Sequence, residues 1–406
     1  MESNNRYVNQ MTFVAVNGGL LFIPVLHMQV DCNINDKIYS APEFILINGA
    51  KYFFSDRKSS FTHRIGVPVR KAGDDHVDTY RIPGLITTDK GTLMATYNVR
   101  HNSSRDLQGD IDIGLSRSFG GGNTWEPMQI VLDKEKWGGL PEKYNGVSDA
   151  CIRNDMGNNR VFICRLWMHG VLSPENGKWI EGLTEQSQEW NHQWNSYGSQ
   201  PGPDVRETSQ IVVTESSDDG KTWSDPLNIT SMCKNPAWWL LAPAPGHGIV
   251  MSDGTMVVPT EGRDEKGNFF SGIMQSKDQG VTWKNSKPAC PDRTTNECQV
   301  VELPAGGLML NMRDLANGEE KGTSNGRTVV VTPDFGKTWQ KHVTSNHALP
   351  EPVCTASLHQ HDFLDSNGKK QTVLFFSNPN SKSYRNRMTI KASFNKRFSE
   401  KWRENN

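Results

Sequence analysis

One eight-residue pattern occurs four times in this chain, and it restricts the fold more than any other feature of the sequence. The copies are SFGGGNTW at 118–125, SSDDGKTW at 216–223, SKDQGVTW at 276–283 and TPDFGKTW at 332–339. An aspartate at the third position can accept hydrogen bonds from its own turn, and a glycine at the fifth can adopt a positive φ. The closing tryptophan can cover the strands beneath. The pattern predicts a hairpin turn made four times, looser in the first copy, where Gly120 replaces the aspartate.

The spacing of these turns predicts a β-propeller. Their tryptophans lie 98, 60 and 56 residues apart, and the last two intervals each suit one four-stranded blade. From about residue 75 the chain reads as short strands punctuated by Gly, Asp and Asn, with little helical periodicity. We expect an all-β fold in which the repeated turns are structural hairpin tips, far from the propeller axis, so that function must come from other residues.

Composition excludes several classes of function. The 406 residues carry a formal net charge of -1. The chain therefore lacks the excess of basic residues that would indicate nucleic-acid binding. The seven cysteines are scattered, without the Cys-x-x-Cys spacing of a metal site or the density of a disulfide framework. The apolar stretch at residues 11–28 is too interrupted by Asn, Gly and Pro for a membrane helix. Strands of a small N-terminal region are favoured there over a signal peptide.

The string TYRIPGL at residues 79–85, followed by the four turns, makes the chain resemble the exo-α-sialidase (neuraminidase) family, of the bacterial type with Asp-box (BNR) repeats. The resemblance covers about residues 75–395. It implies a six-bladed β-propeller whose central depression binds a terminal sialic acid, with retaining hydrolysis of α-linked sialic acids on glycoproteins, glycolipids or oligosaccharides. It also implies no metal, no cofactor, and a secreted, periplasmic or cell-surface location.

The same resemblance divides the chain into two parts. Residues 75–406 would form the sialidase propeller. Residues 1–74 would be a short β-rich region, either an export segment or the remnant of a carbohydrate-binding domain, and they contain no motif that indicates a function.

The substrate explains why arginines are expected. Sialic acid carries an ionised carboxylate, for which planar, permanently charged guanidinium groups are suitable donors. The resemblance assigns this carboxylate to Arg81 in Arg-Ile-Pro, Arg313 at the end of GGLMLNMRD, and Arg385 before the strand MTIKAS. Arg387 competes for the third place, although Arg385 has the better offset. For each arginine the alternative is a place in a surface salt bridge, and this alternative has most weight for Arg385, whose motif is ambiguous.

A polar segment, NVRHNSSRDLQ, is similar to the family's acid/base segment. The resemblance makes Asp106 the group that protonates the leaving oxygen and later takes a proton from water. Arg100, in the same segment, would support a neighbouring carboxylate or contact the substrate. Asp110 and Asp112 are alternatives by position, although the alternation in DIDIGLSRS places them on a strand.

Glu297 precedes Arg313 by sixteen residues, and the resemblance makes it the base that activates a tyrosine nucleophile. An adjacent carboxylate can take the proton of a phenol, and a neutral phenol is not repelled by the substrate's carboxylate. Glu302, on the same strand, is the structural alternative. Asp149 matches a family aspartate near the substrate's N-acyl arm; a turn aspartate is an equal alternative, because Ala150 stands where proline is common.

The tyrosine itself is missing from the expected stretch. In the family it lies a few tens of residues after the third arginine, but the 21 residues after Arg385 contain no tyrosine. The only tyrosine after residue 350 is Tyr384, adjacent to that arginine. We therefore expect the last blade to be incomplete and the activity of this polypeptide to be impaired. The alternative function is a propeller that binds sialic acid without cleaving it.

Overall fold

The computed structural model of the chain describes residues 67–104, 106, 109–134, 145–155, 157–170, 192, 199–205, 207–303, 306–364 and 368–394, with four short strands between residues 30 and 53. Strands dominate this part of the chain, and its α-helix, α1 (Thr230–Cys233), is a single turn. Among the described residues, no helix has the length and apolar character that crossing a lipid bilayer requires. The predictions for residues 11–28 lie outside the described residues.

Most strands belong to units of four consecutive antiparallel strands. The first unit comprises β5 (Thr79–Thr87), β6 (Leu93–Arg100), β7 (Ile111–Ser118) and β8 (Gln129–Leu132). The second comprises β9 (Asn145–Asp155), β10 (Arg160–His169), β11 (Gln210–Ser216) and β12 (Leu227–Asn228). A parallel contact between β7 and β9 joins the two units into one sheet.

The next two units repeat this plan. The third comprises β13 (Leu240–Pro243), β16 (Met256–Arg263), β17 (Phe269–Ser276) and β18 (Lys284–Asn285), with two short strands inserted, β14 (Gly246–His247) and β15 (Ile249–Val250). The fourth comprises β19 (Thr295–Glu302), β20 (Leu308–Asp314), β21 (Thr328–Thr332) and β22 (Gln340–Lys341).

The fifth sheet differs from the others. It contains β23 (Ser357–Leu364), β24 (Lys370–Pro379) and β25 (Met388–Phe394). Its further strands come from the N-terminal region: β1 (Val30–Ile34) pairs in parallel with β25, and β2 (Lys37–Tyr39) pairs with β1. The strands β3 (Phe44–Ile47) and β4 (Ala50–Phe53) form a separate hairpin.

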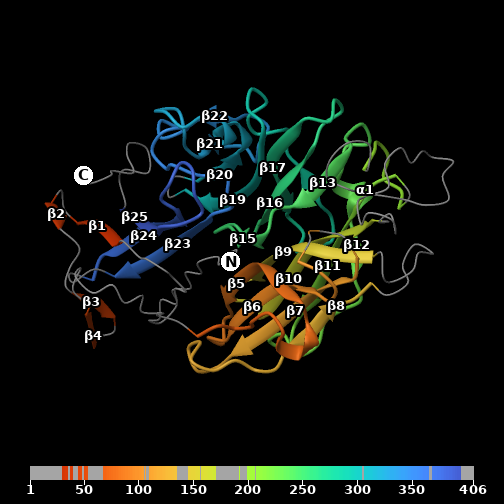
Figure 1. The fold of residues 1–406 in the computed structure, drawn as a ribbon, viewed down its shortest axis with the longest axis horizontal. Coiled ribbons are helices and arrows are strands. Elements are labelled where there is room, and N and C mark those ends of the chain that lie inside the picture. The colour runs from red at the N-terminus through yellow and green to blue at the C-terminus, as the bar shows by residue number, and fades with distance from the viewer. Residues whose placement is uncertain are drawn as a thin grey trace, which may run out of the picture.

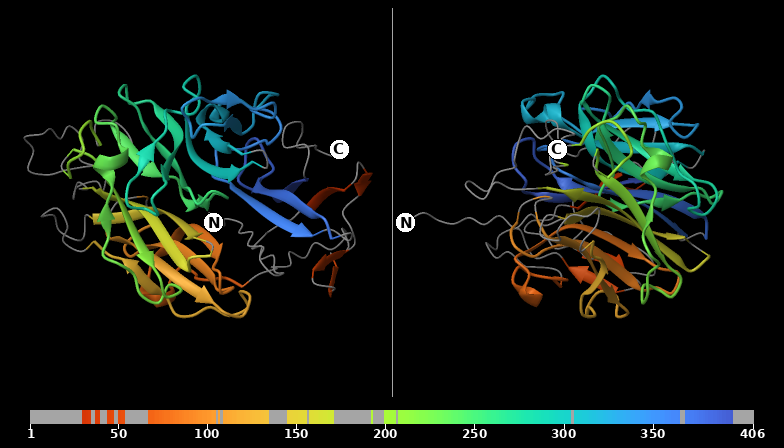
Figure 2. Two further views of the ribbon diagram at one scale, coloured as in Figure 1. Left: turned by 180° about the vertical axis from the view of Figure 1, so that it is seen from behind. Right: turned by 90° about the vertical axis from the view of Figure 1, so that its right-hand side faces the viewer.

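The units follow one another around a common centre. Figures 1 and 2 show them in chain order, with β5, β9 and β15 toward the middle in Figure 1. Consecutive units are in contact, through β5 with β9, β10 with β13, β16 with β19, and β19 with β23. The predicted all-β class is confirmed, and the arrangement is consistent with a β-propeller. The number of six blades stays a prediction.

Apolar side chains fill the space between neighbouring units, and β10 shows how. Val161 and Ile163 belong to a buried cluster shared with the first unit. Phe162 and Cys164, on the opposite face, belong to a cluster shared with the third unit. A strand covered on both faces reads as a nearly continuous apolar run, which is what RVFICRLWM is. The sheets therefore form a rigid frame for the loops at their ends.

The repeated turns connect the third and fourth strands of four units, and their aspartates act as predicted. The Asp278 carboxylate accepts hydrogen bonds from the Thr282 backbone N–H at 2.9 Å and from the Ser276 hydroxyl at 2.8 Å. Asp218 and Asp334 accept the equivalent bonds in their turns. The first copy keeps a backbone bond to its serine hydroxyl, but Gly120 supplies no carboxylate.

The glycine of the last turn allows a sharp test of this role. Gly336 has a φ of 75°, and an added Cβ would lie 2.5 Å from the Cβ of Ser286 and 2.8 Å from the Trp339 ring. Gly254 has a similar φ of 83° in open space. Gly254→Ala should cost about 1–2 kcal/mol for the left-handed backbone alone. Gly336→Ala should cost about 1–3 kcal/mol more, because it also overpacks the turn. Urea unfolding of both variants measures the difference; equal losses would contradict the proposed packing.

Candidate functional site

The candidate site residues come from one end of the sheets. In each unit the first and second strands are antiparallel, so the start of the first lies beside the end of the second. Arg81 stands near the start of β5 and Arg100 ends β6. Likewise, Glu297 is near the start of β19 and Arg313 near the end of β20. The repeated turns follow the third strands and therefore lie at the opposite end, away from this site.

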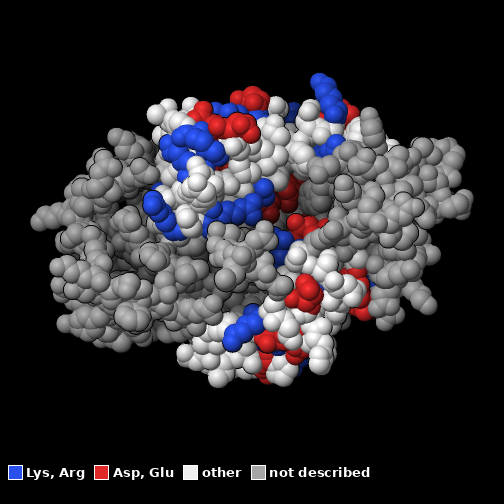
Figure 3. Space-filling view, viewed as in Figure 1, with Lys and Arg blue, Asp and Glu red and all other residues white. Residues whose placement is uncertain are grey.

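The surface over this region combines both signs of charge. On the face seen in Figure 3, basic and acidic side chains lie next to one another around a hollow near the middle of the molecule. A hollow with closely spaced guanidinium and carboxyl groups can bind an anionic ligand and also transfer protons to it.

Asp106 is held by the two arginines of the first unit. The buried Arg100 guanidinium donates to Asp106 Oδ1 at 2.5 Å and to the Ser104 carbonyl at 2.7 Å. Arg81 lies 3.3 Å from the same Asp106 oxygen. The Asp106 side chain is 61% exposed, as a group that reaches over a substrate must be. The described contact of Arg100 with a side chain is with this carboxylate, and both roles named for Arg100 stay predictions.

A β-bulge directs Arg81 toward this contact. The pairing of β5 with β6 shifts register between Arg81 and Gly84, and Ile82 has a φ of 52°. Bulges of this kind re-aim a side chain, and a β-branched residue with positive φ is strained and needs support from its surroundings. The Arg-Ile-Pro motif therefore has a local structural reason as well as a chemical one.

Glu297 and Arg313 form an ion pair across β19 and β20. Arg313 Nη1 donates to Glu297 Oε2 at 2.5 Å. Burial alone would lower the pKa of the Arg313 guanidinium, but the Glu297 carboxylate, with Glu261 and Glu351, holds it above its usual value. The structural alternative, Glu302, accepts hydrogen bonds from Ser252 and does not join the pair.

Asp149 is buried within β9, so it does not lie in a turn. Its backbone has a φ of 53°, and Ser148 Oγ donates to its carboxylate at 3.2 Å. Burial, followed by the charges of Glu297 and Asp106, raises the pKa of Asp149 to about 7. The electrostatic coupling places Asp149 among the carboxyl groups of the site.

Glu261 belongs to the same group, although no sequence motif indicated it. It lies near the end of β16 and is 3% exposed. Burial raises the pKa of Glu261 well above its usual value, and the charges of Glu297 and Asp149 raise it further. The four-stranded repeat could have indicated Glu261. In three units the end of the second strand carries a charged residue, namely Arg100, Glu261 and Arg313.

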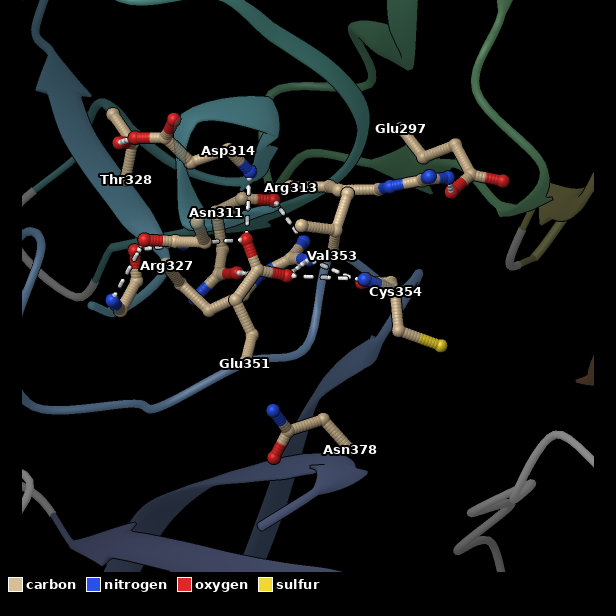
Figure 4. Close-up of polar contacts among 12 residues, drawn as sticks. Glu297, Asn311, Arg313, Asp314, Arg327, Thr328, Glu351, Val353, Cys354 and Asn378 are labelled. Carbon is tan, nitrogen blue, oxygen red and sulfur yellow. Dashed lines mark hydrogen bonds and ion pairs between the residues drawn. The ribbon is translucent and has the colours of Figure 1, made fainter. Parts of the chain in front are cut away.

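A buried ion pair supports Arg313 from below (Figure 4). Arg327 donates to Glu351 Oε2 at 3.0 Å, and both side chains are fully buried. The other Glu351 oxygen accepts from the backbone N–H of Asp314 at 2.7 Å, next to Arg313. Arg327 also donates to the Cys354 carbonyl at 2.8 Å. Sequence reasoning missed this pair because no motif joins its two members.

Arg385 is tied to the loop that carries Glu351. Its guanidinium donates to the Val353 carbonyl at 2.9 Å and is otherwise exposed. Burial raises the pKa of the neighbouring Cys354 thiol, and Arg385, Glu297 and Arg313 all act on that thiol electrostatically. Arg385 therefore lies in the same region as the Glu297–Arg313 pair. Arg387 is exposed as well, with a φ of 53°.

Two predicted alternatives to Asp106 form a cluster of their own. Asp112 is buried in β7, and its carboxylate lies 2.8 Å from His101 Nε2. Burial raises the pKa of Asp112 to about 7. Asp110 is near both, and ligand atoms of the three residues lie within 4.8 Å of one another, so this is where the described residues could share a cation. No ion pair between described residues joins this cluster to Arg81 or Arg100.

Known proteins resemble the chain over most of its length. Residues 91–405 match a family described as BNR repeat-like domain. A sialidase from Bacteroides fragilis (strain YCH46) is 43% identical over 369 residues, 91% of this chain and 62% of that protein. A sialidase from Paraclostridium sordellii is 29% identical over 272 residues, 64% of this chain and 57% of that protein.

A solved structure agrees with these sequences. The Hadza microbial sialidase Hz136 superposes with a TM-score of 0.70 at 39% identity, covering 88% of this chain and 63% of that one. The chain spans less than two thirds of the length of each of these three relatives.

Proposed function

The chain belongs to the bacterial sialidase family with BNR repeats, and from that premise we propose that it is an exo-α-sialidase. Its substrates would be terminal α-linked sialic acids on glycoproteins, glycolipids or oligosaccharides. We also propose a secreted, periplasmic or cell-surface location, where such glycans are displayed. The observation that carries the proposal is the grouping of exposed Asp106 with Arg81 and of Glu297 with Arg313 at one end of the sheets.

Arg81, Arg313 and Arg385 would bind the sialic acid carboxylate. Each guanidinium keeps N–H donors beyond those used within the protein, because each has five and its contacts use only one or two. The Nε of Arg313 is buried without an acceptor among the described residues. An arriving carboxylate could therefore satisfy a donor that is otherwise left unpaired.

Asp106 would transfer the proton in both steps of a retaining reaction. It would protonate the leaving glycosidic oxygen, and then take a proton from the water that releases the sugar. Asp149 would lie near the N-acyl arm of the substrate. The retaining reaction also forms a covalent glycosyl intermediate, which requires a nucleophile; by the family resemblance this would be a tyrosine whose proton passes to Glu297. The proposal includes no metal and no cofactor.

A second candidate function, binding of sialic acid without cleavage, is favoured by one specific observation. The proposed base, Glu297, bonds to Arg313, and no hydrogen bond joins it to a tyrosine among the described residues. Tyr384 is 70% exposed. Without a phenol beside Glu297, the arginines would still recognise the carboxylate.

Turnover of two substrates tests the proposal. If Asp106 is the acid, Asp106→Asn should lower the release of sialic acid from sialyllactose by about 100-fold or more, because a sugar alkoxide leaves poorly without a proton. Release from 4-methylumbelliferyl sialoside should fall much less, since a phenolate leaves without one. Equal losses would remove Asp106 from this role. No turnover together with binding of free sialic acid would establish the second candidate, and neither turnover nor binding by a folded chain would exclude both.

A further inference from the structure

Glu261 is a buried acid without a partner. Its side chain is 3% exposed, and no hydrogen bond or ion pair joins its carboxyl group to another described residue. Its cross-strand neighbours in the sheet are Ala242 of β13 and Ser271 of β17, and neither has a titratable side chain. A buried carboxylate without partners is costly, so a protein that retains one either leaves it protonated or provides it with a ligand.

The charged groups around Glu261 come from three other strands. Glu297 on β19 and Asp149 on β9 disfavour its ionisation, whereas Arg313 on β20 favours it. Arg313 is already paired with Glu297. The thiol of Cys298, also on β19, is kept protonated by burial and by Glu261 itself.

A further cation, Arg263, lies two residues along the same strand and is engaged elsewhere. Arg263 stacks on the rings of Trp239 and Phe269, and its Nε donates to the Gly267 carbonyl. Two carboxyl groups, those of Glu297 and Asp149, disfavour the ionisation of Glu261, whereas one cation, Arg313, favours it. Burial and the charges of Glu297 and Asp149 raise the pKa of Glu261 well above its usual value, which favours the uncharged acid, a hydrogen-bond donor.

The position of Glu261 in the ring of sheets indicates which part of a ligand it would meet. Of the arginines proposed to bind the carboxylate, Arg81 comes from the first unit, Arg313 from the fourth unit and Arg385 from the loop between β24 and β25. Glu261 comes from the third unit, which contacts the second and fourth units. With the carboxylate bound by these arginines, Glu261 would face the uncharged part of the sugar, which carries hydroxyl groups and an amide.

We propose that Glu261 binds sialic acid as an uncharged carboxylic acid that donates a hydrogen bond to a hydroxyl or amide oxygen, so that the site must hold this proton in order to bind. The inference rests on the proposed function. Ionisation of Glu261 would remove the donor and add a negative charge beside Glu297, facing a ligand that is itself an anion. Affinity is therefore complete at pH values below the pKa of Glu261 and is lost as the pH rises through it.

Calorimetric titration with N-acetylneuraminic acid from pH 5 to 9 tests the inference, with Glu261→Gln and Glu261→Ala beside the unmodified protein. The unmodified protein should lose about tenfold in affinity per pH unit above the pKa of Glu261, and buffers of different ionisation enthalpy should show proton uptake there. Glutamine keeps the shape and the donor but cannot ionise. Glu261→Gln should bind within about threefold of the unmodified protein at pH 5, without the loss at high pH, and Glu261→Ala should bind weakly throughout.

Asp149→Asn is the matched control, because Asp149 is buried, has a raised pKa and acts electrostatically on Glu261. If the loss of affinity at high pH persists in Glu261→Gln, or disappears in Asp149→Asn instead, the inference is wrong while the proposed function stands. If the folded, unmodified protein does not bind the sugar at any pH, the proposed function fails and the inference falls with it. Circular dichroism at each pH establishes that every variant is folded.

Discussion

Replacement of Arg313 by alanine should weaken the binding of N-acetylneuraminic acid by about 30-fold or more. Arg313 is mostly buried and ion-paired with Glu297, so its removal takes away a carboxylate donor and leaves the Glu297 carboxylate unpaired, facing an anionic ligand. Loss of one partner from a buried, hydrogen-bonded charge pair costs about 2–5 kcal/mol, and each 1.4 kcal/mol is about a tenfold change in Kd. Calorimetric titration at pH 6 measures the change directly.

Two further variants separate the causes. Arg160 is the first residue of β10 and therefore lies at the end of the sheets opposite the candidate site. It also pairs with a glutamate, Glu215, so Arg160→Ala removes a similar ion pair and should leave the Kd unchanged. Adding Glu297→Gln to Arg313→Ala removes the unpaired charge, and should restore part of the lost affinity. If Arg313→Ala binds as tightly as the unmodified protein, the carboxylate of the ligand does not lie at Arg313.

The largest loss of stability is expected at Glu351. Glu351→Gln removes the charge that pairs with fully buried Arg327, and should lower the free energy of unfolding by about 3–5 kcal/mol. Urea unfolding measures the loss. Glu302 provides a control, because its carboxylate accepts two hydrogen bonds from Ser252 but is only half-buried; Glu302→Gln should cost less than about 1 kcal/mol.

A double variant tests whether the unpaired charge is the cause. In Arg327→Met with Glu351→Gln neither charge remains, so the double variant should be more stable than Glu351→Gln alone. A double variant that is less stable than both single variants would show that packing and the bond to the Asp314 backbone outweigh the charge at this position.

The features that sequence reasoning could predict are those written in short stretches of the chain. The turn aspartates, and Arg100 with Asp106, each lie within a few residues of their partners. Glu297 and Arg313 could be paired because a single hairpin separates them.

The missed residues depend on packing between segments that are distant in the sequence. Glu351 meets Arg327 and the Asp314 backbone only because its loop folds beneath β20. Glu261 joins the site only because three different units place an acid at the same end. No local pattern encodes either contact, and the burial that raises the pKa values of Glu261 and Asp149 is a property of the assembled sheets.

The separation between the repeated turns and the site gives this architecture an evolutionary freedom. The turns stabilise the hairpins at one end, whereas the candidate site is built from strand ends and loops at the other. Mutations that alter ligand preference can therefore accumulate in the loop that carries Asp106 or in the loop between β24 and β25. These loops do not contain the turn residues that stabilise the hairpins. The same frame can be inherited unchanged while its recognition surface diverges.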